Sequence, residues 1–93
     1  MRHEGCLSPQ VLEDRDAIWA YIAADHPPTA VRVDTDLADA IGGLGDYPES
    51  GRPGLIAGTR ELFPIQSYRI VYELNGDDVQ ILAIVHTSRL WPQ

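Results

Sequence analysis

The side chains of this sequence that could do chemistry gather in its last third. Arg69 lies in a stretch of tyrosines and β-branched residues, while His86, Arg89 and Trp91 finish the last apolar run and follow it. Histidine titrates near neutral pH, and an arginine beside an aromatic ring is typical of binding hot spots. We expect the end of the last strand to display His86, Arg89 and Trp91 as a working surface, and Arg69 to lie on the face of the strand before it.

Each of these residues also has a purely structural interpretation. Arg69 shares its predicted strand face with Glu73, so the two could form an ion pair on a solvated sheet surface, which contributes little energy. Trp91 could fold back as an apolar plug, leaving His86 as an exposed strand end. Both interpretations stay open from the residues alone.

Other kinds of chemistry find little support. His3, His26 and His86 are far apart and show no metal-ligand spacing, and the run GRPG lacks the pattern of a phosphate-binding loop. A nucleophilic pair of Cys6 and His86 is the remaining formal possibility. We therefore expect neither a metal nor an organic cofactor.

Length and composition predict one small globular domain spanning residues 1–93. Apolar residues make up 44% and charged residues 23% of the chain. The net charge is −7 and all seven bases are arginine, which argues against a general or sequence-specific DNA binder. The single cysteine excludes an internal disulfide, and apolar runs such as Ile81 to Val85 are far too short to span a bilayer. We expect a cytosolic protein without a signal peptide.

The first half of the chain predicts a helical hairpin. Ser8-Pro9 is a helix start, and apolar residues then recur at helical spacing. The prolines after His26 must break this helix, Thr29 can cap the next one, and the glycines at positions 42, 43 and 45 are expected to end it. The short connection implies antiparallel helices.

The second half predicts strands. Tyr68 to Leu74 and Val79 to His86 are joined by the turn-forming pair Asn75-Gly76, and a shorter strand covers Arg60 to Ile65. The stretch between residues 46 and 58 is expected to be an irregular connector, and a short strand before Ser8 is possible. The predicted fold is α+β with two layers, an N-terminal helical hairpin packed on an antiparallel sheet of three to four strands.

Five stretches in this order resemble the RelE/ParE superfamily of type II toxins. They are SPQVLEDRDAIWAYIAADHP, YPESGRPG, GTREL, YRIVYE and ILAIVHTSRLWP, and the likeness runs from about Ser8 to Pro92. The resemblance implies a bacterial toxin neutralised by a ParD-like or RelB-like antitoxin encoded beside it.

The superfamily holds two activities. RelE-like members cleave messenger RNA in the ribosome with sheet lysines and arginines and a C-terminal tyrosine or histidine, for which Arg69, His86 and Arg89 are the matching residues here. Thr59 and Glu61 stand near the lysine positions, so the electrostatic stabilisation that RNA cleavage needs is poor. ParE-like members poison DNA gyrase without catalysis. The resemblance favours this group, with Arg69, His86, Arg89 and Trp91 binding the target; the alternatives are the nuclease and an inactive relative that only binds antitoxin.

The chain also carries more large apolar residues than a thin two-layer core requires. We therefore expect an apolar groove that receives an amphipathic antitoxin helix. The residues predicted to line it are Trp19, Ile22, Ile41, Leu62 and Phe63.

Overall fold

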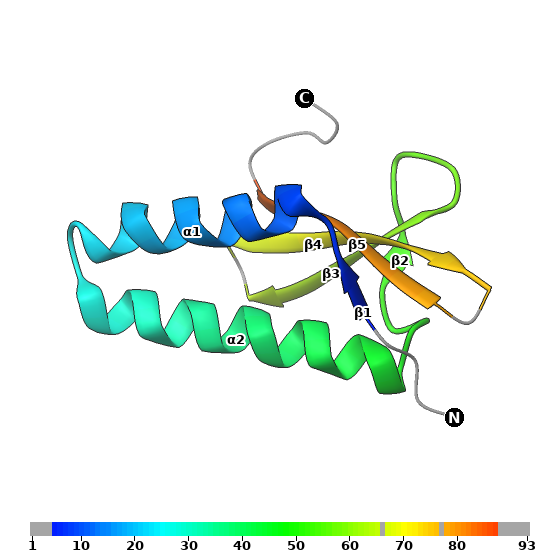
Figure 1. Cartoon of the computed structure of the whole chain (residues 1–93), viewed down its shortest axis with the longest axis horizontal. Helices are drawn as coiled ribbons and strands as arrows, with labels where there is room; N and C mark the ends of the chain where they lie inside the picture. Colours follow the sequence, from blue (N-terminus) through cyan, green and yellow to red (C-terminus); the bar gives the residue numbers. More distant parts are fainter. Residues whose placement is uncertain (1–4, 66, 77, 88–93) are drawn as a thin grey trace.

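The computed structural model describes residues 5–65, 67–76 and 78–87, which form a helical hairpin packed on one five-stranded sheet (Figure 1). The elements are β1 Gly5–Leu7, α1 Pro9–Ala23, α2 Pro27–Asp46, β2 Arg52–Pro53, β3 Thr59–Ile65, β4 Tyr68–Asn75 and β5 Asp78–His86. The strand order is β1-β5-β4-β3-β2. The predicted two-layer α+β fold is therefore confirmed.

The sheet is larger than predicted. Strands β2 to β5 are antiparallel, but β1 adds a parallel edge in which Gly5 pairs with Val79 and Leu7 with Ile81. The connector predicted to be irregular contains β2, which pairs Arg52 with Glu61. Both extra strands are very short, and the partner of β1 is distant in the sequence, so local patterns give them little support.

The first helix begins as predicted, whereas both ends of the second differ. The Val11 amide donates to Ser8 Oγ at 3.3 Å, which makes Ser8 the cap of α1. The cap of α2 is His26, not Thr29, because the Thr29 amide donates to His26 Nδ1 at 3.3 Å. Helix α2 also continues through its glycines to Asp46, since Leu44 is fully buried in the core and this packing outweighs the weak helix propensity of glycine.

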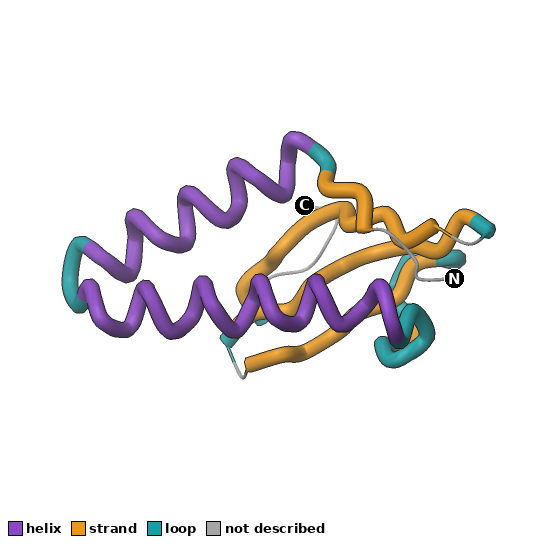
Figure 2. Tube along the Cα trace, turned by 60° about the horizontal axis from the view of Figure 1, so that its bottom comes forward, coloured by secondary structure: helices purple, strands orange, loops and turns teal. Residues whose placement is uncertain are grey.

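The core lies between the hairpin and one face of the sheet. Its fully buried side chains come from both helices and from the two central strands, and they include Val11, Leu37, Ile70, Tyr72 and Ile81. Figure 2 shows that the turn joining the helices projects past the strands, so this core occupies only part of the hairpin's length.

A break in register on β5 ties the sheet to the first helix. Val71 pairs with Ala83 but Tyr72 pairs with Ile81, so Leu82 is an extra residue in β5. The Ile84 amide donates to Asp14 Oδ2 at 3.0 Å, and Ser8 Oγ donates to the Leu82 carbonyl at 3.3 Å. Polar groups of α1 and its cap thus satisfy the backbone around the bulge.

The turn between β4 and β5 is also one residue later than predicted. Asn75 is the last paired residue of β4 and faces Asp78, while Gly76 has a φ of 62°. The positive backbone angle expected in this turn therefore falls on the glycine, where it causes no steric strain. Within the described residues, no helix is long and apolar enough to cross a membrane.

Candidate functional site

The sheet face that the helices do not cover, here called the distal face, carries a small cluster of its own. Val71, Ala83 and Val85 form this cluster and are at most 6% exposed. Arg69 pairs with Val85 across the β4–β5 ladder and belongs to the same face. Arg69 therefore lies next to buried apolar side chains. The interpretation that it lies on a solvated sheet surface is wrong.

The partner of Arg69 is Glu61 on the neighbouring strand, not the predicted Glu73. Arg69 Nε lies 3.9 Å from Glu61 Oε1, and the two residues are only 7% and 8% exposed. Glu73 is four residues further along the same strand as Arg69, roughly 13 Å away by strand geometry, and its Oε1 accepts a hydrogen bond from Asn75. A buried arginine held against a carboxylate is poorly placed to receive a phosphate.

His86 lies on the opposite side of the sheet from Arg69. Its ring meets the Tyr68 ring edge-on, with centroids 5.4 Å apart, and Tyr68 belongs to the core under the helices. Burial, and secondarily the nearby Tyr21, raises the pKa of the Tyr68 hydroxyl above its ordinary value of 10.0. His86 itself is exposed, so it can meet a partner but not together with Arg69.

Two members of the predicted surface, Arg89 and Trp91, lie outside the described residues, and their role stays a prediction. The Cys6 and His86 pair is excluded by strand register. Cys6 pairs with Gln80, which is six residues before His86 and thus roughly 20 Å away along β5. No group of histidine, cysteine and acidic side chains among the described residues could hold a metal ion.

The residues predicted to form an antitoxin groove are divided between the core and two surfaces. Ile22, Ile41 and Leu62 are partly buried and pack against the core, and their contact with an antitoxin stays a prediction. Trp19 is 41% exposed beside a hollow of about 450 Å³ on the helical hairpin. Phe63 is 39% exposed on β3, at another surface.

Gly51, the first glycine of the GRPG run, has a packing role that sequence inspection missed. The Gly51 amide donates to Tyr72 Oη at 2.9 Å, and that hydroxyl donates to the Pro48 carbonyl at 2.8 Å. A Cβ on Gly51 would lie 2.6 Å from Tyr72 Oη and 2.9 Å from the Glu61 carbonyl oxygen. This contact fixes the connector against the sheet. In the sequence, Gly51 looks like one more turn residue of the connector, so its packing role could not be recognised there.

Beyond this contact, the segment between β2 and β3 stands out from the sheet (Figure 1). We call residues 54–58 the β2–β3 loop. Leu55 is 70% and Ile56 44% exposed at its tip, and at its base the Arg52 guanidinium lies 4.4 Å from the centroid of the Phe63 ring. Of the residues on this apolar and cationic surface, only Phe63 had a predicted role, as part of the antitoxin groove.

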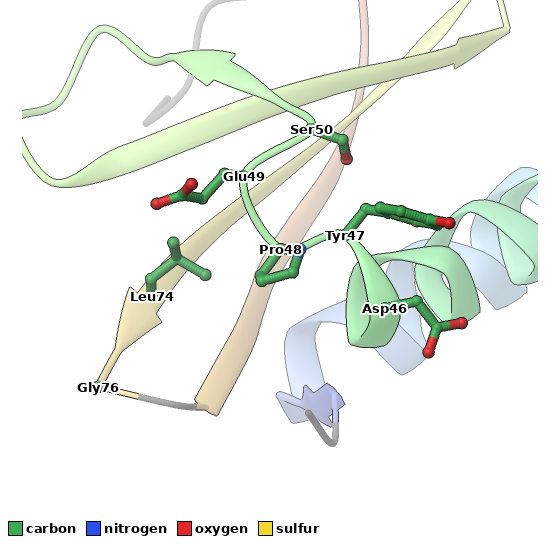
Figure 3. Close-up of a pocket in the computed structure, with 7 residues that line it drawn as sticks. All are labelled: Asp46, Tyr47, Pro48, Glu49, Ser50, Leu74 and Gly76. Carbon is green, nitrogen blue, oxygen red and sulfur yellow. The ribbon is translucent and has the colours of Figure 1, made fainter. Parts of the chain in front are cut away.

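A second hollow, of about 500 Å³, lies between the end of α2 and the β4–β5 turn. Figure 3 shows that the side chains of Asp46, Tyr47 and Glu49 point away from one another. Because its polar groups do not converge, this hollow does not have the arrangement of a catalytic site.

Comparisons with known proteins agree on the RelE/ParE superfamily of toxins. Residues 7–91 match the family described as the ParE toxin of the type II toxin-antitoxin system parDE. The toxin candidate Y4kP of Sinorhizobium fredii is 42% identical over 90% of this chain and 88% of its own length, and toxin RelE2 of Caulobacter vibrioides is 37% identical over 87% and 91%.

Solved structures show the same fold. A structure of the chromosomal ParDE system from P. aeruginosa has a TM-score of 0.81 at 21% identity, covering 91% of this chain and 96% of that one. The RelBE2 toxin-antitoxin complex from Mycobacterium tuberculosis has a TM-score of 0.65 at 20% identity, covering 92% and 99%.

Proposed function

The chain belongs to the ParE toxin family of type II toxin-antitoxin systems, and from that membership we propose that it binds and inhibits DNA gyrase. We further propose that it acts in the cytoplasm and that a cognate antitoxin neutralises it. The solved neighbours are described as a ParDE system and a RelBE2 toxin-antitoxin complex, which supports an antitoxin partner.

The observation that favours gyrase over RNA cleavage is the separation of Arg69 from His86. Cleavage by attack of a 2′-hydroxyl needs a proton-transfer group and a cation at the same phosphate. Arg69 is buried beside Glu61 on the distal face, and His86 contacts Tyr68 on the other face. Inhibition by binding needs only a complementary surface, to which His86, Arg89 and Trp91 would contribute.

Ribosome-dependent cleavage of messenger RNA is the second candidate. It is supported by the name of the Caulobacter relative, toxin RelE2, which covers most of this chain. In that case Arg69 and Arg89 would have to approach the RNA together with His86, which requires Arg69 to leave Glu61. An inactive relative that retains only antitoxin binding is the third candidate.

The structure leads us to propose a different antitoxin-binding surface from the one expected from the sequence. Ile22, Ile41 and Leu62 already contact the core, so we propose that the antitoxin covers Trp19 and the hollow beside it. An amphipathic helix with one apolar anchor and polar flanks would meet Trp19 and the ion pair of Arg15 with Asp34, whose atoms are 2.9 Å apart.

The test is to express the toxin alone and follow replication and translation separately. We expect replication to stop and a DNA-damage response to appear while protein synthesis continues, and the purified toxin should inhibit supercoiling by gyrase. Co-expression of the adjacent antitoxin should abolish both effects. Early translation arrest with cleaved messenger RNA would instead establish the nuclease.

A further inference from the structure

The β2–β3 loop exposes its largest apolar side chains to solvent. Leu55 and Ile56 are adjacent in the sequence and are 70% and 44% exposed. Single exposed aliphatic residues are common on protein surfaces, but two adjacent ones in a segment that projects from the sheet place apolar area within reach of a partner (Figure 1).

The loop is held in one shape by its own hydrogen bonds. The Gly54 amide donates to the Thr59 carbonyl at 2.9 Å, and the Thr59 amide donates to the Ile56 carbonyl at 3.0 Å. Thr59 Oγ1 donates to the same Ile56 carbonyl at 2.6 Å, and Gly58 supplies the positive φ of 87° that the bend requires. A loop ordered in advance loses little entropy when it binds.

The β2–β3 loop lies within the least acidic part of an acidic chain. Residues 50–72 carry three arginines and only Glu61 as an acid, which gives this stretch a net charge of +2. The rest of the chain carries −9, and the two parts add to the total of −7. Arg69 lies against Glu61, and Arg60 donates to the Gly51 carbonyl at 2.8 Å. Arg52 forms no ion pair with any described residue and rests on Phe63, where its charge can meet an acid of a partner.

From these observations we propose that the β2–β3 loop is the anchor by which the toxin enters its protein target. Leu55 and Ile56 would fill an apolar recess, and Arg52 would pair with a carboxylate at the rim of that recess. This inference rests on the proposed function, because it assigns part of the target-binding surface to a segment outside the predicted C-terminal cluster.

The shape of the loop favours a folded target over the antitoxin. A projecting tip needs a preformed concave site, which a large folded enzyme can offer. The amphipathic helix proposed for the antitoxin would instead lie along a groove or flat surface such as the one beside Trp19. A polyanion or an anionic bilayer is disfavoured, because the chain has a net charge of −7 and the loop itself carries no charged residue, with Arg52 at its base.

The experiment compares full-length toxin carrying Leu55→Ser or Leu55→Ser with Ile56→Ser against toxin carrying Val31→Ser. Val31 is a matched control because it is 54% exposed on α2, and its replacement also removes an exposed aliphatic side chain. Half-inhibition of gyrase supercoiling, antitoxin affinity, molecular mass in solution and thermal unfolding are measured for each variant. We expect the double change to raise the half-inhibitory concentration roughly 10- to 100-fold, with the other three properties unchanged.

Four other outcomes would decide against the anchor. Unchanged inhibition by the double variant would overturn it, as would an equal loss in Val31→Ser. A loss confined to antitoxin affinity would assign the loop to the antitoxin, and a change in mass would assign it to a second copy of the chain. If the wild-type toxin leaves supercoiling intact, the proposed function fails. The loop is then judged by growth arrest in cells, where full toxicity of the double variant would overturn the anchor.

Discussion

Replacing Gly51 by alanine should destabilise this domain, whereas the same replacement at Gly42 should stabilise it. Gly51 lies against the ring of Tyr72, which is completely buried, and a Cβ there would be 2.6 Å from Oη and 2.8 Å from Cε1. Around Gly42, within α2, a Cβ would meet nothing within 4 Å. The chemical change is identical, so the two variants separate packing from the general effect of removing a glycine.

The expected size of each effect follows from these contacts. Inserting a methyl group into a tightly packed site costs about 1 to 3 kcal/mol, and moving the connector away would weaken its hydrogen bonds to Tyr72 at about 1 kcal/mol each. The Gly51→Ala variant should therefore lose about 2 to 4 kcal/mol, which lowers the melting temperature of a domain this size by about 10 to 25 °C. Gly42→Ala should gain about 0.5 to 1 kcal/mol from higher helix propensity.

Thermal and urea unfolding of the two purified variants and the wild type would measure these changes. A Tyr72→Phe background offers a further check, because it removes the nearest atom, Oη, and leaves Cε1 in place. Part of the cost of Gly51→Ala should disappear there, as in a double-mutant cycle between contacting residues. A Gly51→Ala protein that unfolds like the wild type, or a cost independent of Tyr72, would refute the proposed packing.

Three further predictions concern buried polar groups. Asp14→Ala should cost about 1 to 3 kcal/mol in urea unfolding, because it leaves a β5 amide without its acceptor, while Glu13→Ala on the exposed surface should stay within about 0.5 kcal/mol of wild type. Arg69→Ala should cost about 3 to 5 kcal/mol by leaving Glu61 as a buried uncompensated charge, and the double change Arg69→Met with Glu61→Leu should restore most of the melting temperature; equal stability of the single and double variants would contradict this. Because the pKa of Tyr68 is raised by folding, its contribution to stability is complete below pH 10 and is lost as the pH rises through the folded pKa. Tyr68→Phe should therefore flatten the fall of melting temperature above pH 10.

Local patterns predicted the parts of the fold that depend on neighbours in sequence. The cap at Ser8 and the three long strands were identified because their signals lie within a few residues. The glycines near position 43 suggested a helix end, but Leu44 is buried by contacts with distant strands, and a sequence window does not contain that information. Strand β1 was only a weak possibility for the same reason, since its partner lies on β5.

The candidate site was harder to predict than the fold. Arg69 was recognised as unusual, but its partner depends on the β3–β4 register, which places Glu61 rather than Glu73 against it. His86 was identified as displayed, yet the side of the sheet it occupies depends on the bulge at Leu82, and no local pattern marked that bulge. Leu55 and Ile56 are exposed in the β2–β3 loop, but nothing in the sequence distinguishes them from apolar residues that are buried.

The pairing of β1 with β5 has a consequence for how the toxin is made. Gly5 pairs with Val79, so the first strand must wait for the last one before the sheet can close. The 40 residues from Tyr47 to His86 follow the helical hairpin, and at about 5 to 20 residues per second the ribosome needs roughly 2 to 8 s to add them. During that interval the apolar side of the hairpin, including Ile18 and Ile22, has no sheet to cover it. The nascent toxin should then be open to chaperones and proteases, and harmless to the cell, until β5 has been synthesised and paired.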